Sequence, residues 1–148
     1  MECGLWVDDR TRRAKEGLRE NMYSEKVLQH FQNPHNVGEI AEADGFGKAT
    51  GGEHCPEDLA YFWIRVDGER LAEVKQKTRG CPVAIAASSV TGVLAEGKTL
   101  EEAGRITTEA VAAVLGDMPE RKLDSIVGPK ALQAAIVDYR AKTAAHKA

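Results

Sequence analysis

Apolar and polar side chains alternate in the middle of the chain, where every second residue from Ala60 to Val66 is apolar. A repeat of two residues predicts a strand with one face turned toward the core. The pair Asp67-Gly68 follows at once, and Asp-Gly is a strong signal for a tight hairpin turn. Residues 71–79 then predict a second strand. Because antiparallel pairing sets the start of one strand beside the end of the other, we expect the segments flanking this hairpin to be neighbours.

Helical patterns cover most of the remaining chain. Ser24 is a good N-cap for a helix with three apolar residues on one face, which Asn33-Pro34 ends. A turn-rich stretch, 34–45, and a short strand near 46–50 come before the hairpin. A later helix is expected over residues 82–96, and a short one begins at the capping box Thr99-Leu-Glu-Glu102. Another helix is expected from Thr107 or Thr108 to Gly116. The last helix is indicated by the helical spacing of Leu132, Ala135, Ile136 and Tyr139.

The composition of the chain limits its function classes. Its 148 residues fit one domain, and 43% hydrophobic with 29% charged residues is ordinary for a globular protein. A net charge of -3 gives no reason to expect nucleic acid or an acidic membrane surface as the main partner. No apolar run is long enough to cross a bilayer, and the N-terminus lacks the apolar segment of a secretory signal, so we expect a cytoplasmic protein. Three cysteines in that reducing compartment favour metal or sulfur chemistry over a structural disulfide.

Cys81 lies between the second hairpin strand and the helix that opens at Pro82. The dipole and unpaired amides of a helix N-terminus favour the thiolate, which is the form of cysteine that ligates metals and attacks sulfur. Lys77 and Arg79, on the strand before it, are expected to act in the same direction. The alternative is a small buried hydrophobic residue, as free cysteines often are.

Cys55 is the second candidate, in the turn-rich segment Gly51-Gly-Glu-His-Cys-Pro-Glu-Asp58. It precedes the first hairpin strand, so antiparallel pairing should bring it beside Cys81. Two thiols with His54, Glu57 and Asp58 nearby would form half of a metal site. Sequence spacing alone does not reveal such a site, because no Cys-x-x-Cys motif is present.

Five segments of the chain, taken together, resemble one known family. They are Met22-Tyr-Ser-Glu-Lys-Val27, Asn33-Pro-His-Asn-Val-Gly38, Gly80-Cys-Pro-Val-Ala-Ile-Ala-Ala-Ser-Ser89, Lys98-Thr-Leu-Glu-Glu-Ala103 and Ala131-Leu-Gln-Ala-Ala-Ile-Val-Asp-Tyr-Arg140. In this order, and over nearly the whole chain, they resemble the scaffold proteins of iron-sulfur cluster assembly, the IscU/NifU N-terminal family. The resemblance implies an α+β fold, a three-stranded antiparallel sheet with helices packed mainly on one face. The hairpin and helices expected above agree with it.

The resemblance also implies which residues hold a cluster. Family members typically carry Cys-Gly-Asp, then Gly-Cys before a helix, then His-Cys-Ser before the last helix. Cys55 matches the first cysteine and Cys81 the second. The family aspartate corresponds to Asp58 by register with the strand, or to Glu57 by counting from the cysteine.

At the third motif, Leu123 and Asp124 stand where the family has His and Cys, so the third cysteine is missing. In the family that cysteine is a chief candidate for accepting persulfide sulfur. Asp124 can ligate iron or zinc through oxygen, but it cannot carry a sulfur atom; its alternative is a helix N-cap or a solvated loop carboxylate. The preceding loop, Asp117-Met-Pro-Glu-Arg-Lys122, keeps one proline of the Leu-Pro-Pro-Val-Lys motif that an Hsp70-type chaperone recognises in some members. We interpret it as an ordinary solvated linker.

The function that the resemblance implies is a scaffold, not an enzyme. It would bind iron and sulfide, or a transient cluster, through Cys55 and Cys81, take sulfur from a cysteine desulfurase and pass the cluster to acceptor proteins. One subunit would use both thiols with Asp58 and Asp124, or a homodimer would supply four thiolates. One alternative is a zinc-binding or metal-free adaptor that has lost assembly activity. Another is a thiol enzyme with Cys81 as nucleophile and His54 as base, although His54 is expected to be a loop residue more often than a ligand or base.

Residues 1–21 lie outside the resemblance. They mix acidic and basic side chains with few apolar ones, so they can bury little surface to offset the entropy cost of ordering. We expect a mobile extension that can be removed, followed by a scaffold domain over residues 22–148. The alternatives are a true start that lies further downstream, near Met22, and a helix from about Arg10 to Glu20 that docks on a partner through Leu5 and Trp6. Cys3 falls in this extension and is expected to take no part in the site.

Overall fold

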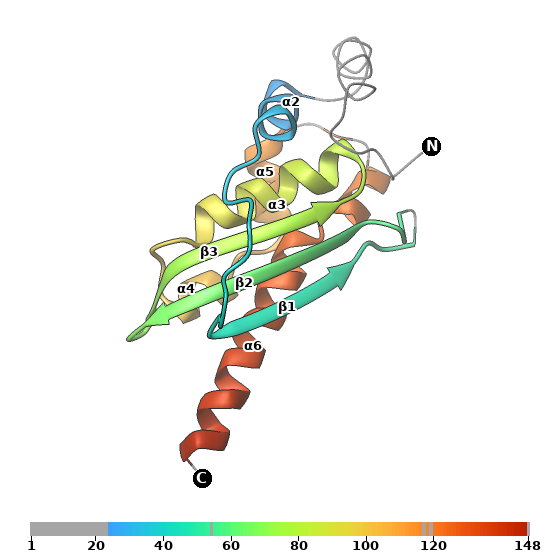
Figure 1. Ribbon diagram of the computed structural model, residues 1–148. Helices are drawn as coiled ribbons and strands as arrows, with labels where there is room; N and C mark the ends of the chain where they lie inside the picture. Colours follow the sequence, from blue (N-terminus) through green and yellow to red (C-terminus); the bar gives the residue numbers. More distant parts are fainter. Residues whose placement is uncertain (1–23, 54, 117, 119, 148) are drawn as a thin grey trace.

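The computed structural model describes residues 24–147 except 54, 117 and 119. At its centre is a three-stranded antiparallel sheet in the order β1 (Gly45–Thr50), β2 (Leu59–Asp67) and β3 (Arg70–Arg79). Helix α2 (Glu25–Gln32) precedes the sheet. The elements that follow it are α3 (Pro82–Ala95), α4 (Leu100–Gly104), α5 (Thr108–Leu115), the 3-10 helix η1 (Glu120–Ser125) and α6 (Gly128–Lys147), as drawn in Figure 1.

Strands β2 and β3 form the predicted hairpin. Leu59 pairs with Arg79, and the turn at the other end contains Gly68 with φ of 65°, a left-handed conformation that glycine adopts without strain. The inward side chains of β2, namely Ala60, Phe62 and Ile64, are fully buried, as the alternation predicted. The pairing therefore brings the segment before Leu59 beside the segment after Arg79.

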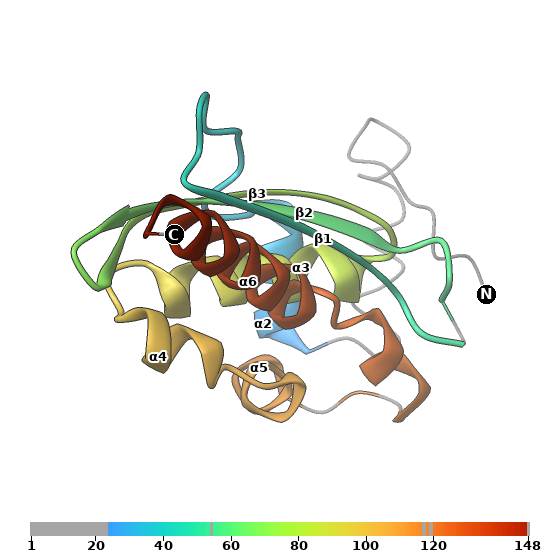
Figure 2. The same cartoon turned by 90° about the horizontal axis from the view of Figure 1, so that it is seen from below.

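Helices α3 and α6 pack against the same face of the sheet, and α2 and α5 pack on α3 (Figure 2). Gly47 in β1 permits the close approach of α6, because a Cβ atom there would lie 2.3 Å from backbone atoms of Ala131 and Ala135. The small side chains of α3 let it be buried on nearly all sides. The predicted α+β fold is confirmed, with its helices on one face.

The chain between α2 and β1 adds a feature that the sequence did not indicate. Val37 forms a parallel bridge with Gln76 on the outer edge of β3. The chain then rises from the face of the sheet opposite the helices (Figure 2) and returns to β1, where the Asp44 carboxylate accepts a hydrogen bond from the Val66 amide at 2.7 Å. Within the described residues, no helix is both long enough and apolar enough to cross a membrane.

Candidate metal centre

The two candidate cysteines meet at one end of the β2–β3 hairpin, as antiparallel pairing predicted. Cys55 lies in the turn before β2, and Cys81 directly follows β3 as the N-cap residue of α3. Pro82 occupies the first turn of that helix, where its missing amide proton costs nothing. The exposed fraction is 1% for Cys55 and 0% for Cys81. Both sulfur atoms are therefore enclosed by the fold.

Asp58 completes a group of three ligand residues. The sulfur atoms of Cys55 and Cys81 and a carboxylate oxygen of Asp58 all lie within 4.8 Å of one another, and all three residues are buried. Asp58 Oδ1 accepts a hydrogen bond from the Cys81 amide at 3.2 Å, and Oδ2 lies 3.6 Å from the Cys81 sulfur. Gly80 makes this approach possible, because a Cβ atom there would meet Asp58 Oδ1 at 2.3 Å. The geometry fits one metal ion bound by two sulfurs and an oxygen.

The other predicted residues lie outside this group of three. Glu57 is exposed, so the structure places Asp58 rather than Glu57 beside the thiols. Asp124 is half-buried in η1; its backbone oxygen accepts a hydrogen bond from the Gly52 amide at 2.9 Å, and a Cβ atom on Gly52 would meet its carboxylate carbon at 2.8 Å. Asp124 therefore lies against the turn that leads to Cys55. His54 and Cys3 fall outside the described residues.

Ser125 is a site residue that the sequence reasoning missed. Its hydroxyl oxygen lies 3.2 Å from the Cys81 sulfur, and it also hydrogen-bonds to Asp58. It is carried by η1 and is 0% exposed. The loop before it, 117–122, was interpreted above as a solvated linker, and that interpretation was wrong for Lys122, which is 1% exposed. The sequence did hold one indication of this role: Ser125 directly follows Asp124, the position that matches the third family cysteine.

Burial sets the protonation of the site. Burial raises the pKa of the Cys81 thiol, and the Asp58 carboxylate raises it further, while the hydrogen bond with Ser125 and the charge of Lys122 oppose the rise. Burial likewise raises the pKa of Asp58, against the effect of its hydrogen bonds with Ser125 and Cys81. The expectation of a thiolate favoured by the helix N-terminus was therefore wrong for the metal-free protein. A bound cation has to displace these protons.

The Lys and Arg side chains expected to assist Cys81 are both exposed. Lys77 is exposed and forms an ion pair with Glu39, with 2.8 Å between Nζ and Oε2. Arg79 is also exposed. A buried cation, Lys122 of η1, lowers the pKa of the Cys81 thiol against the effect of burial.

The redox state of the two cysteines differs. Cys81 is a free cysteine, whereas Cys55 is disulfide-bonded in the structure. The expectation that the cysteines form no disulfide was therefore wrong for Cys55. Reduction has to precede any metal binding by this residue, since the thiolate is the ligand.

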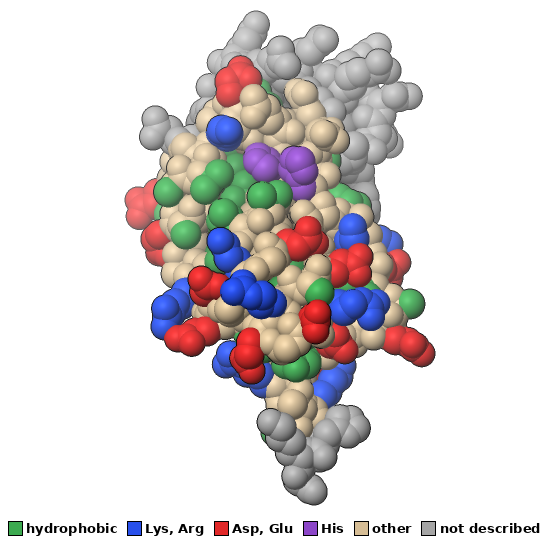
Figure 3. All heavy atoms as spheres, turned by 90° about the vertical axis from the view of Figure 1, so that its left-hand side faces the viewer, with side chains coloured by type: hydrophobic (Ala, Val, Ile, Leu, Met, Phe, Trp, Pro, Cys, Tyr) green, Lys and Arg blue, Asp and Glu red, His purple; other side chains and the backbone are tan. Residues whose placement is uncertain are grey.

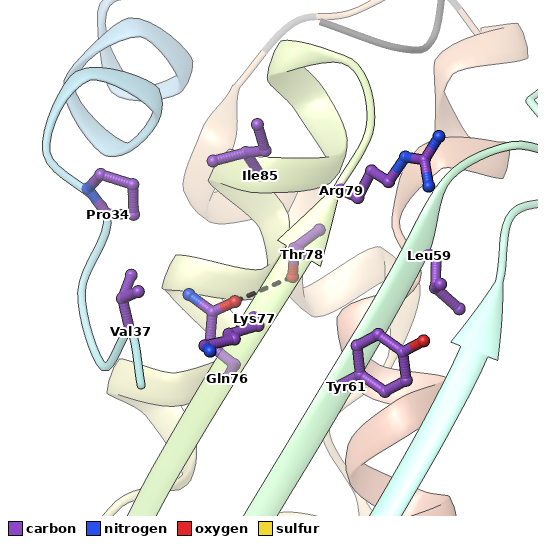
Figure 4. A pocket seen from close by; sticks show the side chains of 9 residues that line it. All are labelled: Pro34, Val37, Leu59, Tyr61, Gln76, Lys77, Thr78, Arg79 and Ile85. Carbon is purple, nitrogen blue, oxygen red and sulfur yellow. Dashed lines mark hydrogen bonds between the residues drawn. The ribbon is translucent and has the colours of Figure 1, made fainter. Parts of the chain in front are cut away.

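A separate apolar groove of about 480 Å³ is lined by residues of β2, β3, α3 and the chain before β1. Figure 4 shows Pro34 and Val37 on one side of it, Tyr61 of β2 on the other and Ile85 of α3 at one end. None of the three grouped ligand residues lines it. The face drawn in Figure 3 combines a hydrophobic patch beside histidine side chains with acidic and basic side chains that are mixed rather than sorted by sign.

The sequence matches a family model described as the NifU-like N terminal domain, over residues 22–146. The chain belongs to this family. It is 49% identical over 119 residues to the iron-sulfur cluster assembly scaffold protein IscU 1 of Archaeoglobus fulgidus, which covers 80% of this chain and 76% of the relative. It is 41% identical over 122 residues to the IscU scaffold protein of Haemophilus influenzae, covering 81% of this chain and 97% of the relative.

Solved structures support the fold of this family member. The N-terminal part of a NifU-like protein from Brucella abortus superposes with a TM-score of 0.66, covering 84% of this chain and 99% of the other at 17% identity. At that identity the similarity concerns the fold alone. It agrees with the three-stranded sheet and one-sided helices described above.

Proposed function

We propose that this protein is an iron-sulfur cluster assembly scaffold rather than an enzyme. The observation that carries the proposal is the buried group of Cys55, Asp58 and Cys81, whose ligand atoms lie within 4.8 Å of one another. Thiolates dominate iron-sulfur ligation, and a carboxylate oxygen is an acceptable ligand for iron. The names of the relatives in Archaeoglobus and Haemophilus support the same function.

The proposed cargo is iron with sulfide, held as a transient cluster. Cys55 and Cys81 supply thiolates, Asp58 supplies a carboxylate, and Asp124 is proposed as a further oxygen ligand from the turn beside Gly52. Because both sulfurs are buried within one subunit, we favour a site built by a single chain over one shared in a homodimer. Sharing would require the hairpin end to open.

The proposed partners follow from the chemistry of sulfur. Assembly needs a sulfur donor, for which we propose a cysteine desulfurase, and apoproteins that accept the cluster. Since Asp124 cannot carry sulfur, persulfide would form on Cys81 or Cys55. A cytoplasmic location, where thiols stay reduced, is part of the proposal.

A second candidate is a zinc-binding adaptor. Two thiolates and a carboxylate are also an ordinary zinc ligand set, and position 124 offers an oxygen instead of a third sulfur. A thiol enzyme has less support, because the Cys81 sulfur is fully buried and burial raises its pKa.

Metal analysis separates the two candidates. The protein is purified without oxygen and reduced, and then iron, zinc and acid-labile sulfide are measured per chain. Iron with sulfide in comparable amounts is the expected result for a scaffold. Zinc alone, or no metal after incubation with ferrous iron, sulfide and a thiol, would replace the scaffold proposal with the adaptor.

A further inference from the structure

Lys122 is buried beside the metal centre without a hydrogen-bond partner. Its exposed fraction is 1%, and its ammonium nitrogen contacts no acceptor among the described residues. Removing an ammonium group from water is strongly unfavourable unless another charge or several acceptors replace the water. The missing partner is therefore informative, because a methionine or leucine would fill the same space without this cost.

The position of Lys122 shows which charges it faces. It lies three residues before Ser125 in η1, which packs on α3, and the Ser125 hydroxyl contacts the Cys81 sulfur. The charge of Lys122 acts on both Asp58 and Cys81, lowering the pKa of each against the effect of burial. Every other Lys and Arg side chain that the structure describes is at least partly exposed.

The charges of a loaded site explain the need for such a group. Two thiolates and one carboxylate bring three negative charges, and a divalent cation neutralises two of them. One negative charge then remains inside the protein, where it is costly. The ammonium of Lys122 cancels this excess for the three grouped ligands and halves it with Asp124 bound as a fourth, and it can donate hydrogen bonds to anionic sulfur.

We propose that Lys122 is the counter-ion of the loaded site, positioned by η1 to balance the excess negative charge of two thiolates and Asp58 around a bound divalent cation. This inference rests on the proposed function of the same group of ligands. Lys122 is a positioning and charge-balancing residue, not a metal ligand. In the metal-free protein the unpaired ammonium destabilises the folded state, but the positive charge is already in place when a cation binds.

The test compares Lys122→Met, which keeps the length and loses the charge, with Lys122→Arg, which keeps the charge. Lys130→Met is the matched control, since Lys130 is exposed at the start of α6. Zn²⁺ alone is the probe, and its affinity is measured by competition with a chromophoric chelator in protein reduced with a phosphine. Thermal melting of each metal-free protein is recorded in parallel.

We expect Lys122→Met to weaken Zn²⁺ binding by at least about tenfold, the effect of one nearby opposite charge on the ionised form of a group. Its metal-free form should melt at the same or a higher temperature than the wild type, because an unpartnered charge has been removed. Lys122→Arg should retain most of the affinity, and Lys130→Met all of it. A lysine that only fills space would give the same or a higher melting temperature in Lys122→Met with unchanged Zn²⁺ affinity, so the affinity decides between the two roles.

Unchanged Zn²⁺ affinity in Lys122→Met, or an equal loss in Lys130→Met, would overturn the inference while leaving the proposed function intact. Lys122→Gln serves as a second neutral variant, so that poor folding of one substitution does not decide the result. If the reduced wild-type protein binds neither Zn²⁺ nor iron, the proposed metal function has failed and the inference is overturned with it.

Discussion

At the residue scale, Asp58 has to satisfy two opposed conditions. Its side chain is fully buried, which favours the neutral carboxyl group, yet it has to be ionised to bind a cation. Burial accordingly raises its pKa in the folded protein. The folded state therefore holds a proton that the unfolded state has already released. Between the ordinary carboxyl pKa and the raised pKa of Asp58 in the folded protein, the free energy of unfolding falls as pH rises. The affinity of Asp58 for a cation increases over the same interval, because the cation binds the ionised carboxylate.

We expect Asp58→Asn to remove this dependence of stability on pH. Urea unfolding of the reduced, metal-free protein is measured from about pH 4, the ordinary carboxyl pKa, to about pH 7. The wild-type free energy of unfolding should fall across the interval relative to that of the variant, because Asp58 ionises against its burial. Burial lowers the pKa of His30, which adds the same rise with pH to the stability of both proteins. The amide oxygen of asparagine can still accept from the Cys81 amide, so the backbone hydrogen bond is retained.

Asp138→Asn is the matched control for this experiment. The hydrogen bond from Lys142, followed by that from the Phe46 amide, lowers the pKa of Asp138, so its stabilising contribution is lost only as pH falls below about 4. The control should therefore keep the wild-type slope above that pH. An Asp58→Asn variant with the wild-type slope would show that another group governs the titration.

The two thiols should be individually necessary for metal binding. Four-ligand zinc sites bind with about 10–16 kcal/mol at neutral pH, so losing one of four ligands should cost about 3 kcal/mol, or roughly 100-fold in affinity. We expect that loss for Cys55→Ser and for Cys81→Ser, measured by chelator competition in reduced protein. Cys3→Ser should leave the affinity intact, and an equal loss from it would reject the assignment of Cys55 and Cys81 as ligands.

At the scale of elements, the parts of the site that come from periodic structure were predictable. The alternation from Ala60 to Val66 and the Asp67-Gly68 turn fixed the hairpin, and the hairpin brought Cys55 beside Cys81. The capping box at Thr99, with both reciprocal hydrogen bonds, was also correct. These elements depend on residues close in sequence, which pattern analysis can detect.

The contribution of η1 was not predictable in the same way. Six residues of 3-10 helix carry no hydrophobic period, and Lys122 is a residue type that is almost never fully buried. Its burial depends on packing of η1 against α3, a contact between segments distant in sequence. The prediction of a thiolate at Cys81 was wrong for a related reason. The helix N-terminus could be predicted from the sequence, but the burial that raises the pKa of the thiol could not.

Element η1 also carries Asp124, which stands in the place of the third family cysteine. If sulfur arrives as a persulfide, Asp124→Cys should increase the sulfur retained after reaction with a cysteine desulfurase, because it adds a nucleophilic thiol beside the turn that leads to Cys55. Mass spectrometry of trapped persulfides measures the gain. Asp124→Ser is the matched control, similar in size and without sulfur. The same yield from both variants would mean that sulfur does not pass through this position.

At the scale of the whole molecule, both cysteine sulfurs of the site are buried within one chain. The Cys81 sulfur contacts Ser125 of η1, and the α2 side chains Val27 and Phe31 are fully buried as well. Among the described residues, the core cluster that contains Cys55 and Cys81 begins at Val27, within the matched family region that begins at residue 22.

Removal of residues 1–21 should consequently be tolerated. These residues are rich in charge and poor in apolar side chains, so their ordering could contribute little to stability. We expect a chain that begins at Met22 to keep its metal content and to lose less than about 1 kcal/mol in the free energy of unfolding. Both proteins are compared in reductant, by metal analysis and urea unfolding, so that a disulfide at Cys55 does not contribute to the difference. A larger loss of stability, or loss of metal from the shortened chain, would show that the first 21 residues belong to the folded domain.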